Sequence, residues 1–266
     1  MEIKVKQFSS LAKLQSVNDI PKNNDCYRVT ALKGEHFAYQ FVLNSNNLVY
    51  QAKCEIKSDL EEGIEAYFVD YAVMDYAYPR NADDDYITKE NGIMPDILIP
   101  LKEKDNIIYV DSLTTIWIDV NIPENCKPGI YTVIFKVKSL TESDYEGFEV
   151  FEVMKIRVLD VELPEQKTLY TQWFHTDCIA SIHNVEIYSE QHWELIDKYM
   201  KMAKDVGMNM ILTPKVTPHL NVLKGSSRPN VQLVDINENE DGYTFDFTKL
   251  KRWVELTKKN KIQYYE

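Results

Sequence analysis

The residues best suited to chemistry follow one another in a short segment. Trp173, His175 and Asp177 place an aromatic ring, an imidazole and a carboxylate close together in the chain. This combination suits a sugar, because the ring can stack on its C–H face while the polar groups bind its hydroxyls. The alternative is structural: Trp173 packs in the core, and His175 and Asp177 cap the next turn. Both interpretations stay open on the spacing alone.

A long connection supplies the next candidates. The segment 213–246 greatly exceeds the roughly 2 to 6 residues that usually join such strands and helices, and long loops are often functional. It contains Thr217, His219 and Arg228, and two strand-like runs around the polar turn 237–242 predict a hairpin on the active face. We take Thr217 as a candidate substrate contact and His219 as a loop-packing residue. Arg228 either binds substrate or fixes the loop.

Other chemistry-bearing patterns are weak. Glycoside hydrolysis needs paired carboxylates, but the acidic runs 83–85 and 238–241 lie in expected loops and are typical of solvated charge. Nucleophile elbows, phosphate-binding loops and dinucleotide fingerprints are missing from the sequence. The five histidines form no zinc-binding motif, so no metal and no cofactor is predicted.

The elements that must position these candidates form two halves. In residues 168–266, LYTQWF predicts a short strand, Ser189 caps a helix that Gly207 ends, and MNMILTP predicts a buried strand. A second helix begins near Asp246, and KIQYYE predicts a third strand. Alternating strands and helices indicate parallel βαβ units. We interpret them as the first βαβαβ part of a (β/α)₈ barrel, truncated because such a barrel needs roughly 250 residues. Open sheet edges favour a natural protein that continues.

Residues 1–163 predict a different architecture. Apolar and polar residues alternate with period two in GEHFAYQFVL, TTIWIDVNIP and IYTVIFKV, with turn residues between the runs. This pattern is typical of an antiparallel β-sandwich. The sequence therefore predicts a multi-domain chain with a linker near residues 160–167.

Composition excludes several classes of partner. The 266 residues carry 30 Lys+Arg against 42 Asp+Glu, a net charge of −12. Nucleic-acid binding and adhesion to anionic membranes are disfavoured, because both need clustered basic residues. The N-terminus lacks the apolar core of a signal peptide, which predicts a cytoplasmic protein unless a leader has been trimmed. The four widely spaced cysteines predict reduced thiols.

Several segments, in order, resemble glycoside hydrolase family 123 and the related DUF4091 proteins. They are IWIDVNIPENCKPGIYTVIFKV, LYTQWFHTDCIA, ILTPKVTPHL, RPNVQLVDI and FDFTKLKRWVELTKKNKIQYYE. The resemblance implies a β-sandwich followed by a (β/α)₈ barrel. It also implies exo-β-N-acetylgalactosaminidase activity on a glycan with a terminal N-acetylhexosamine.

The family's mechanism is substrate-assisted retention. The acetamido oxygen of the substrate attacks the anomeric carbon, an Asp orients that group, and an adjacent Glu is the general acid/base. Nothing in 1–266 matches that Asp-Glu pair, so the resemblance places the catalytic residues beyond Glu266 and predicts an inactive fragment. Trp173, His175 and Asp177 match the family's first-strand segment. Glu266, ending the third predicted strand, is a weaker substrate-binding candidate.

Two functions therefore compete. The first is the N-terminal part of a β-N-acetylhexosaminidase-type glycosidase. The second is a non-catalytic carbohydrate-binding module. An adjacent Asp-Glu pair within further βα units after Glu266 would favour the enzyme, and a stop codon there would favour the binding module.

Overall fold

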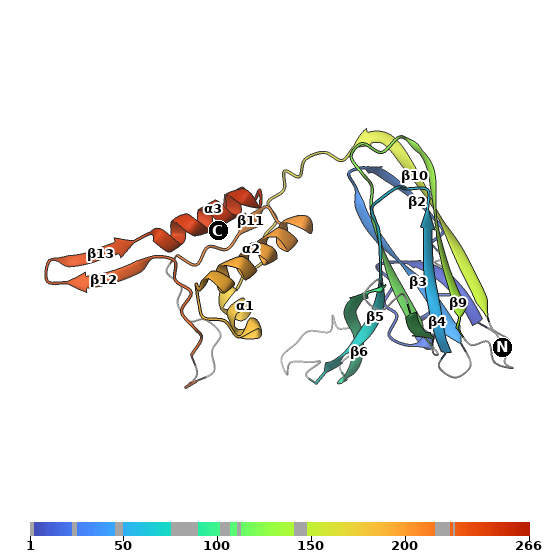
Figure 1. Cartoon of the computed structure of the whole chain (residues 1–266), viewed down its shortest axis with the longest axis horizontal. Coiled ribbons are helices and arrows are strands. Elements are labelled where there is room, and N and C mark those ends of the chain that lie inside the picture. The colour runs from blue at the N-terminus through green and yellow to red at the C-terminus, as the bar shows by residue number, and fades with distance from the viewer. Residues whose placement is uncertain are drawn as a thin grey trace. The chain divides into compact units, whose positions relative to one another are not determined.

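The structure is a computed structural model, and it describes residues 3–22, 26–45, 50–75, 90–101, 107–110, 113–140, 148–215, 224–225 and 227–266. The chain forms two compact units, Met1–Pro164 and Glu165–Glu266. Each unit is described by itself (Figure 1). The acidic run 83–85 and the candidates Thr217 and His219 lie outside the described residues.

Unit 1 is a sandwich of two five-stranded sheets (Figure 1). The first sheet runs in the order β1 (Ile3–Ser9), β3 (His36–Ser45), β8 (Thr114–Asn121), β5 (Ile64–Met74) and β6 (Gly92–Pro100). The second runs in the order β2 (Arg28–Lys33), β10 (Glu149–Glu162), β9 (Gly129–Ser139), β4 (Tyr50–Ser58) and β7 (Ile107–Val110). A short 3₁₀ turn covers Val17–Asp19.

The predicted alternation positions the core of the sandwich. On β8, Ile116, Ile118 and Val120 are fully buried, whereas the intervening Trp117 is only half-buried. Buried side chains of both sheets pack together, and the rings of Phe41 and Phe135 lie 4.4 Å apart between centroids. Period-two alternation therefore selected the inward face correctly.

The expectation of an all-antiparallel sandwich is wrong at one pair. β10 pairs with β2 in parallel, Lys155 opposite Arg28 and Val158 opposite Ala31. Alternation specifies which side chains face the core but not the direction of a strand. Here the chain passes from the first sheet at β1 to the second at β2, so β2 has no hairpin partner to force an antiparallel pairing.

A second, smaller apolar cluster packs the N-terminal segment onto the first sheet. Phe8, Leu14, Val42 and Leu113 form it. The buried Gln40 fixes the same segment, because its side-chain amide donates to the carbonyls of Ser9 at 3.0 Å and Ala12 at 2.9 Å. Residues 10–15 are thereby held against the outer face of this sheet.

The described residues of unit 2 form three helices and four short strands. In chain order these are α1 (Thr176–His183), α2 (Glu190–Asp205), β11 (Met210–Ile211), β12 (Asp235–Asn239), β13 (Gly242–Asp246), α3 (Thr248–Lys259) and β14 (Tyr264–Tyr265). The core joins Trp193, Ile196 and Met200 of α2 with Trp253 of α3 and Ile211 of β11. β11 and β14 are parallel, and β12 and β13 form the predicted hairpin.

Three sequence expectations for unit 2 need correction. The expected strand LYTQWF is not a strand, although the Tyr170 carbonyl accepts the N–H groups of Asn209 and Met210. The side chain of Asn209 accepts the N–H of Tyr170 at 2.8 Å. This side-chain hydrogen bond replaces the backbone hydrogen bond that a strand would make there. In addition, α3 begins at Thr248 with Phe247 as its N-cap residue, two residues after the predicted start near Asp246. The Asp246 carboxylate still accepts the N–H of Thr248 at 2.8 Å, as a capping residue would.

The third correction concerns the segment after Trp173. The sequence predicts no helix directly after LYTQWF, yet α1 begins at Thr176 and places Asp177 in its first turn. His175 is the N-cap residue and makes no side-chain capping bond, so the usual cap signal is missing. Within the described part of unit 2, the parallel pairing is limited to β11 and β14, which does not amount to a barrel.

Candidate functional site

Polar groups gather where the parallel strands β11 and β14 end. The Glu266 N–H donates to the Ile211 carbonyl at 2.9 Å, and the Thr213 N–H donates to the Glu266 carbonyl at 3.0 Å. The Thr171 hydroxyl donates to the Glu266 carboxylate at 3.3 Å. The carboxyl ends of parallel strands are the usual place for a site in α/β folds. Glu266 is thus held beside Thr171 and Thr213 with its side chain exposed.

Trp173, two residues after Thr171, offers an aromatic surface. Its side chain is 64% exposed, and its ring lies 5.9 Å from that of His175 at an interplanar angle of 89°. A largely exposed indole held in a T-shaped contact with another ring offers a stacking surface for an apolar ligand face. The candidate face is defined as Thr171, Trp173, His175, Thr213 and Glu266.

Asp177 and Arg228 are joined in an ion pair. The Arg228 Nε donates to one carboxylate oxygen of Asp177 at 2.6 Å, and Nη2 donates to the other at 2.8 Å. The Asp177 side chain is only 7% exposed, against 28% for Arg228. Hydrogen bonding to Asp177 raises the pKa of the Arg228 guanidinium. Because both carboxylate oxygens accept from Arg228, the pair ties the loop around 228 to the start of α1.

A buried histidine fixes α1 against α2. The fully buried His192 accepts the N–H of Tyr188 at Nδ1, 2.8 Å away, and its Nε2 lies 2.9 Å from the Thr176 carbonyl. Nδ1 is therefore an acceptor, and the proton belongs on Nε2. Burial lowers the pKa of His192, which favours this neutral form.

Tyr188 extends the network to the loop. Its ring stacks on Trp193 at 4.9 Å, and its hydroxyl donates to the Val231 carbonyl. Burial raises the pKa of this hydroxyl, so it remains a donor at neutral pH. The Leu233 N–H also donates to the Pro214 carbonyl at 2.9 Å. The described end of the long loop is therefore anchored at several points.

The hairpin β12–β13 carries exposed apolar side chains. Ile236, Tyr243, Phe245 and the adjacent Phe247 are all exposed. The acidic residues of its turn, 238–241, are solvent-exposed, as expected for solvated charge. Lys249 at the start of α3 pairs with Asp235 at 2.8 Å and fixes the base of the hairpin.

The predicted candidates thus occupy three arrangements. Trp173 lies beside His175, Asp177 pairs with Arg228, and Glu266 contacts Thr171. Sequence reasoning missed Thr171, Thr213 and Tyr188. The position of Thr213 at a strand end could have indicated it, whereas nothing local signals the left-handed backbone of Tyr188 at φ 59°.

The described residues limit the chemistry available. Within those ranges, no cluster of three or more His, Cys, Asp and Glu side chains is arranged to hold a metal ion. Among the described helices, none is both long and apolar enough to cross a membrane. The candidate face itself offers a ring, an imidazole and one exposed carboxylate.

Comparison with solved structures gives a strong likeness to a glycoside hydrolase. A family 123 glycoside hydrolase from Clostridium perfringens, reported in work on glycolipid glycan hydrolysis, matches with a TM-score of 0.76 at 17% identity. The match covers 98% of this chain and 46% of that one, so the chain spans about half of the Clostridium enzyme's length. At this identity the likeness establishes the fold.

Other structural matches are distant. AvmM, which catalyses macrocyclization in alchivemycin A biosynthesis, matches with a TM-score of 0.31 at 11% identity, covering 62% of this chain and 92% of AvmM. The sporulation control protein Spo0M from Bacillus subtilis matches with a TM-score of 0.27 at 9% identity, covering 69% and 56%. Neither score supports an inference. No curated protein matches the sequence significantly.

Family sequence models agree with the strong structural match in both units. The glycoside hydrolase 123 N-terminal domain matches residues 12–139, within unit 1. The glycoside hydrolase 123 catalytic domain matches residues 173–266, which begin at Trp173 and end at Glu266. With the two domains in this order, the chain belongs to glycoside hydrolase family 123.

Proposed function

We propose that this chain forms the N-terminal sandwich and the sugar-recognition part of an exo-β-N-acetylgalactosaminidase that works by substrate-assisted retention. Family membership supports a glycosidase that acts on a glycan. The observation that carries the proposal within the chain is the exposed Trp173 ring at the start of the catalytic-domain match, two residues after Thr171, whose hydroxyl donates to Glu266. The glycan of a glycolipid is the expected substrate, by similarity to the Clostridium enzyme.

The proposed roles follow from the geometry of each group. Trp173 stacks on the apolar face of the terminal sugar, and His175 supports the ring edge-on while presenting its own nitrogens. Glu266 and Thr171 bind sugar hydroxyls. Asp177 and Arg228 are assigned to positioning instead of sugar contact, because both Asp177 oxygens accept from Arg228 and the Asp177 side chain is only 7% exposed. They position the loop and α1.

The reacting groups of the proposed mechanism come from elsewhere in the enzyme. Retention assisted by the acetamido group needs a carboxylate that orients this group and a proton-bearing carboxyl beside the leaving oxygen. Asp177 cannot fill either role while Arg228 occupies both of its oxygens. We therefore expect the 266-residue chain to bind the sugar without hydrolysing its glycoside.

Sugar binding tests the recognition half of this proposal. Saturation-transfer NMR with N-acetylgalactosamine should detect binding to the chain, and Trp173→Ala should abolish it. Phe151→Ala is the matched control, because Phe151 is 61% exposed, close to the 64% of Trp173, but lies in unit 1. Equal binding by the wild-type chain and Trp173→Ala would remove Trp173 from the site.

Hydrolysis tests the other half. The purified chain is incubated with 4-nitrophenyl β-N-acetylgalactosaminide, and release of 4-nitrophenol is followed. We expect no turnover. Steady turnover that survives purification would place the catalytic residues within 1–266 and refute the assignment of roles given above.

A non-catalytic carbohydrate-binding module is the second candidate. The observation that favours it is that the candidate face is equipped for stacking and hydrogen bonding, with Glu266 as its one exposed carboxylate. The coding sequence after the codon for Glu266 separates the two. An adjacent Asp-Glu pair within further βα units supports the enzyme, and a stop codon supports the binding module.

A further inference from the structure

A groove on the outer face of the first sheet of unit 1 has no role in the proposed site. Its volume is about 800 Å³, within the range of roughly 300 to 1,000 Å³ typical of ligand pockets. One wall is the segment 10–15, which Gln40 anchors, and the floor comes from β3, β5, β6 and β8. The groove therefore lies wholly within unit 1.

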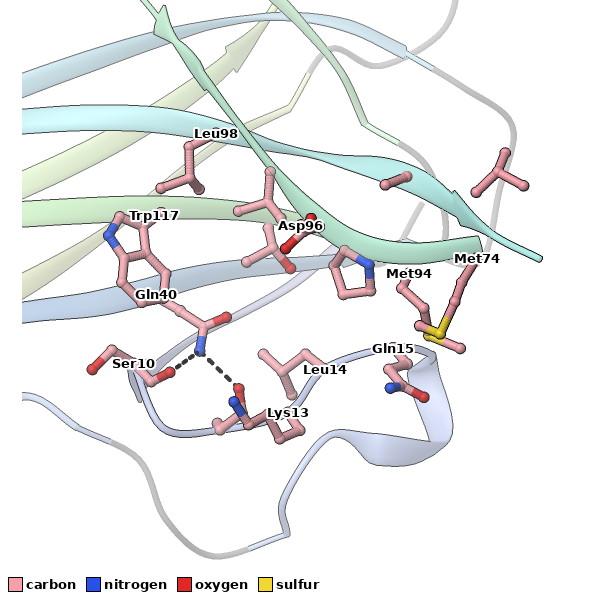
Figure 2. Close-up of a pocket in the computed structure, with 16 residues that line it drawn as sticks. Ser10, Lys13, Leu14, Gln15, Gln40, Met74, Met94, Asp96, Leu98 and Trp117 are labelled. Carbon is pink, nitrogen blue, oxygen red and sulfur yellow. Dashed lines mark hydrogen bonds between the residues drawn. The ribbon is translucent and has the colours of Figure 1, made fainter. Parts of the chain in front are cut away.

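Most side chains that line the groove are apolar. In Figure 2, Trp117 and Leu98 lie at one end, Met74 and Met94 lie at the other, and Leu14 lies between the two ends. Methionine side chains adapt to ligands of irregular shape. The lining continues onto solvent-exposed Val73, so apolar surface is left in contact with water.

Two side-chain donors of the floor, those of Gln40 and Trp117, are engaged within the protein. The side-chain amide of Gln40 donates to the Ser9 and Ala12 carbonyls, and the indole N–H of Trp117 donates to Asp119 at 2.7 Å. These donors are therefore not available to form hydrogen bonds with the hydroxyl groups of a sugar. The floor consequently favours an apolar ligand over a polar one.

Two exposed charges of opposite sign border the groove. Lys13 belongs to the wall segment, and Asp96 belongs to β6 (Figure 2). Together they offer a donor and an acceptor without a net charge, which complements a neutral polyhydroxy head better than a charged one.

Pairing with an extended peptide is disfavoured. β6 is an edge strand of its sheet, but Pro95 and Pro100 remove backbone donors from it, and a register irregularity at Asp70 and Tyr71 of the neighbouring β5 disturbs the ladder. An edge protected in this way is a poor template for an added strand.

We propose that the groove binds the aliphatic chain of a neutral, single-chain amphiphile, with the chain between Leu14 and Leu98 and the head near Lys13 and Asp96. This site lies outside the proposed sugar-binding face and does not depend on the glycosidase function. The binding measurement below involves no hydrolysis, so its failure would leave the proposed function untouched.

Isothermal titration calorimetry of the full 266-residue chain with octyl, decyl and dodecyl maltoside, each below its critical micelle concentration, tests the proposal. Complete burial of a methylene raises an association constant about 4-fold, and half-burial about 2-fold. Each step of two methylenes should therefore raise affinity by roughly 4- to 15-fold. Maltose, which has no chain, should not bind.

Val73→Asp places a charge in the groove and should lower dodecyl maltoside affinity at least about 10-fold. Ile130→Asp is the matched control, because Ile130 is 71% exposed against 80% for Val73 but lies on β9 of the other sheet. Leu98→Asp is the second variant if Val73→Asp alters the circular dichroism spectrum. Affinity that is independent of chain length, equal loss in Ile130→Asp, or binding of maltose alone would each overturn the proposal, as would the absence of binding.

Discussion

Removal of Arg228 is the most informative perturbation of the candidate site. Arg228→Ala leaves the Asp177 carboxylate in place without the guanidinium that now satisfies both of its oxygens. Asp177→Ala leaves the guanidinium without its carboxylate. The two variants break the same ion pair by removing different partners. Any difference between their losses of unfolding free energy therefore reports how well the remaining group is solvated.

The exposed fractions of the two side chains determine how much unfolding free energy each variant should lose. Removing one partner of a buried pair costs roughly 3 to 5 kcal/mol, because a buried charge loses its compensation. Asp177 is 7% exposed and cannot reach water easily, so Arg228→Ala should cost about 3 kcal/mol. Arg228 is 28% exposed on a long side chain and can turn toward solvent, so Asp177→Ala should cost only about 1 to 2 kcal/mol. The double variant should cost less than the sum of the two.

Tryptophan fluorescence can follow the urea unfolding of unit 2. Trp173, Trp193 and Trp253 lie in unit 2, and Trp117 alone of the four tryptophans lies in unit 1. A Trp117→Phe background therefore restricts the signal to unit 2, which avoids treating a two-unit chain as one transition.

Arg252 provides the matched control for this experiment. It also makes a bidentate pair, donating to Glu190 at 2.7 and 2.6 Å, but the Glu190 carboxylate is exposed. Arg252→Ala should cost no more than about 1 kcal/mol, including the loss of its contact with the Trp193 ring. Equal costs for Arg228→Ala and Arg252→Ala, or a larger cost for Asp177→Ala than for Arg228→Ala, would refute the reasoning from burial.

Three further predictions concern the supporting structure. Burial lowers the pKa of His192, so the folded state resists protonating it, and the free energy of unfolding should fall as pH drops below about 6.5, the ordinary histidine value. His192→Gln should remove that step from a series of urea titrations at decreasing pH. The Ser189 hydroxyl accepts the N–H of His192 and caps α2, so Ser189→Ala should cost about 1 kcal/mol in the same titration. Gly63 and Gly225 have nearly equal φ values of +88° and +86°, but a Cβ at Gly63 would meet the Asn121 carbonyl oxygen at 2.1 Å, whereas one at Gly225 would meet no atom within 4 Å. Gly225→Ala should cost about 1 kcal/mol of backbone strain, and Gly63→Ala should lower the melting temperature further because of the added clash. Similar melting temperatures for the two variants would contradict this expectation.

Local periodicity was sufficient where an element is decided by its own residues. α2 begins directly after Ser189, whose hydroxyl caps it, and its buried residues Trp193, Ile196 and Met200 follow helical spacing. The alternation on β8 placed Ile116 on the core side for the same reason. In both cases the spacing of apolar residues within one segment determines which face is buried.

Elements decided by distant residues were not predictable. Residues 169–174 depend on Asn209, 39 positions away from Tyr170, whose side chain takes a bond that a strand would have made. The pairing of Asp177 with Arg228 joins residues 51 positions apart. Both residues could be selected as candidates by type, but only the three-dimensional contact shows that each satisfies the other. The groove of unit 1 is similar, because its lining comes from four strands and a terminal segment.

The contact between Asp177 and Arg228 changes which role can be assigned to the segment that begins at Trp173. By type, this segment offers a ring, an imidazole and a carboxylate, and the carboxylate is the group that could take part in bond cleavage. A retaining mechanism requires a carboxylate free to act on the anomeric centre or on an acetamido group. A carboxylate that is almost fully buried and accepts two short hydrogen bonds from arginine is a structural anchor instead. What remains on the candidate face is an exposed indole next to an imidazole, with Glu266 held by Thr171, which is equipment for recognition. Within the proposed function, burial of the single carboxylate in the segment assigns Asp177 to holding α1 and the loop around 228 together, and it leaves bond cleavage to other carboxylates.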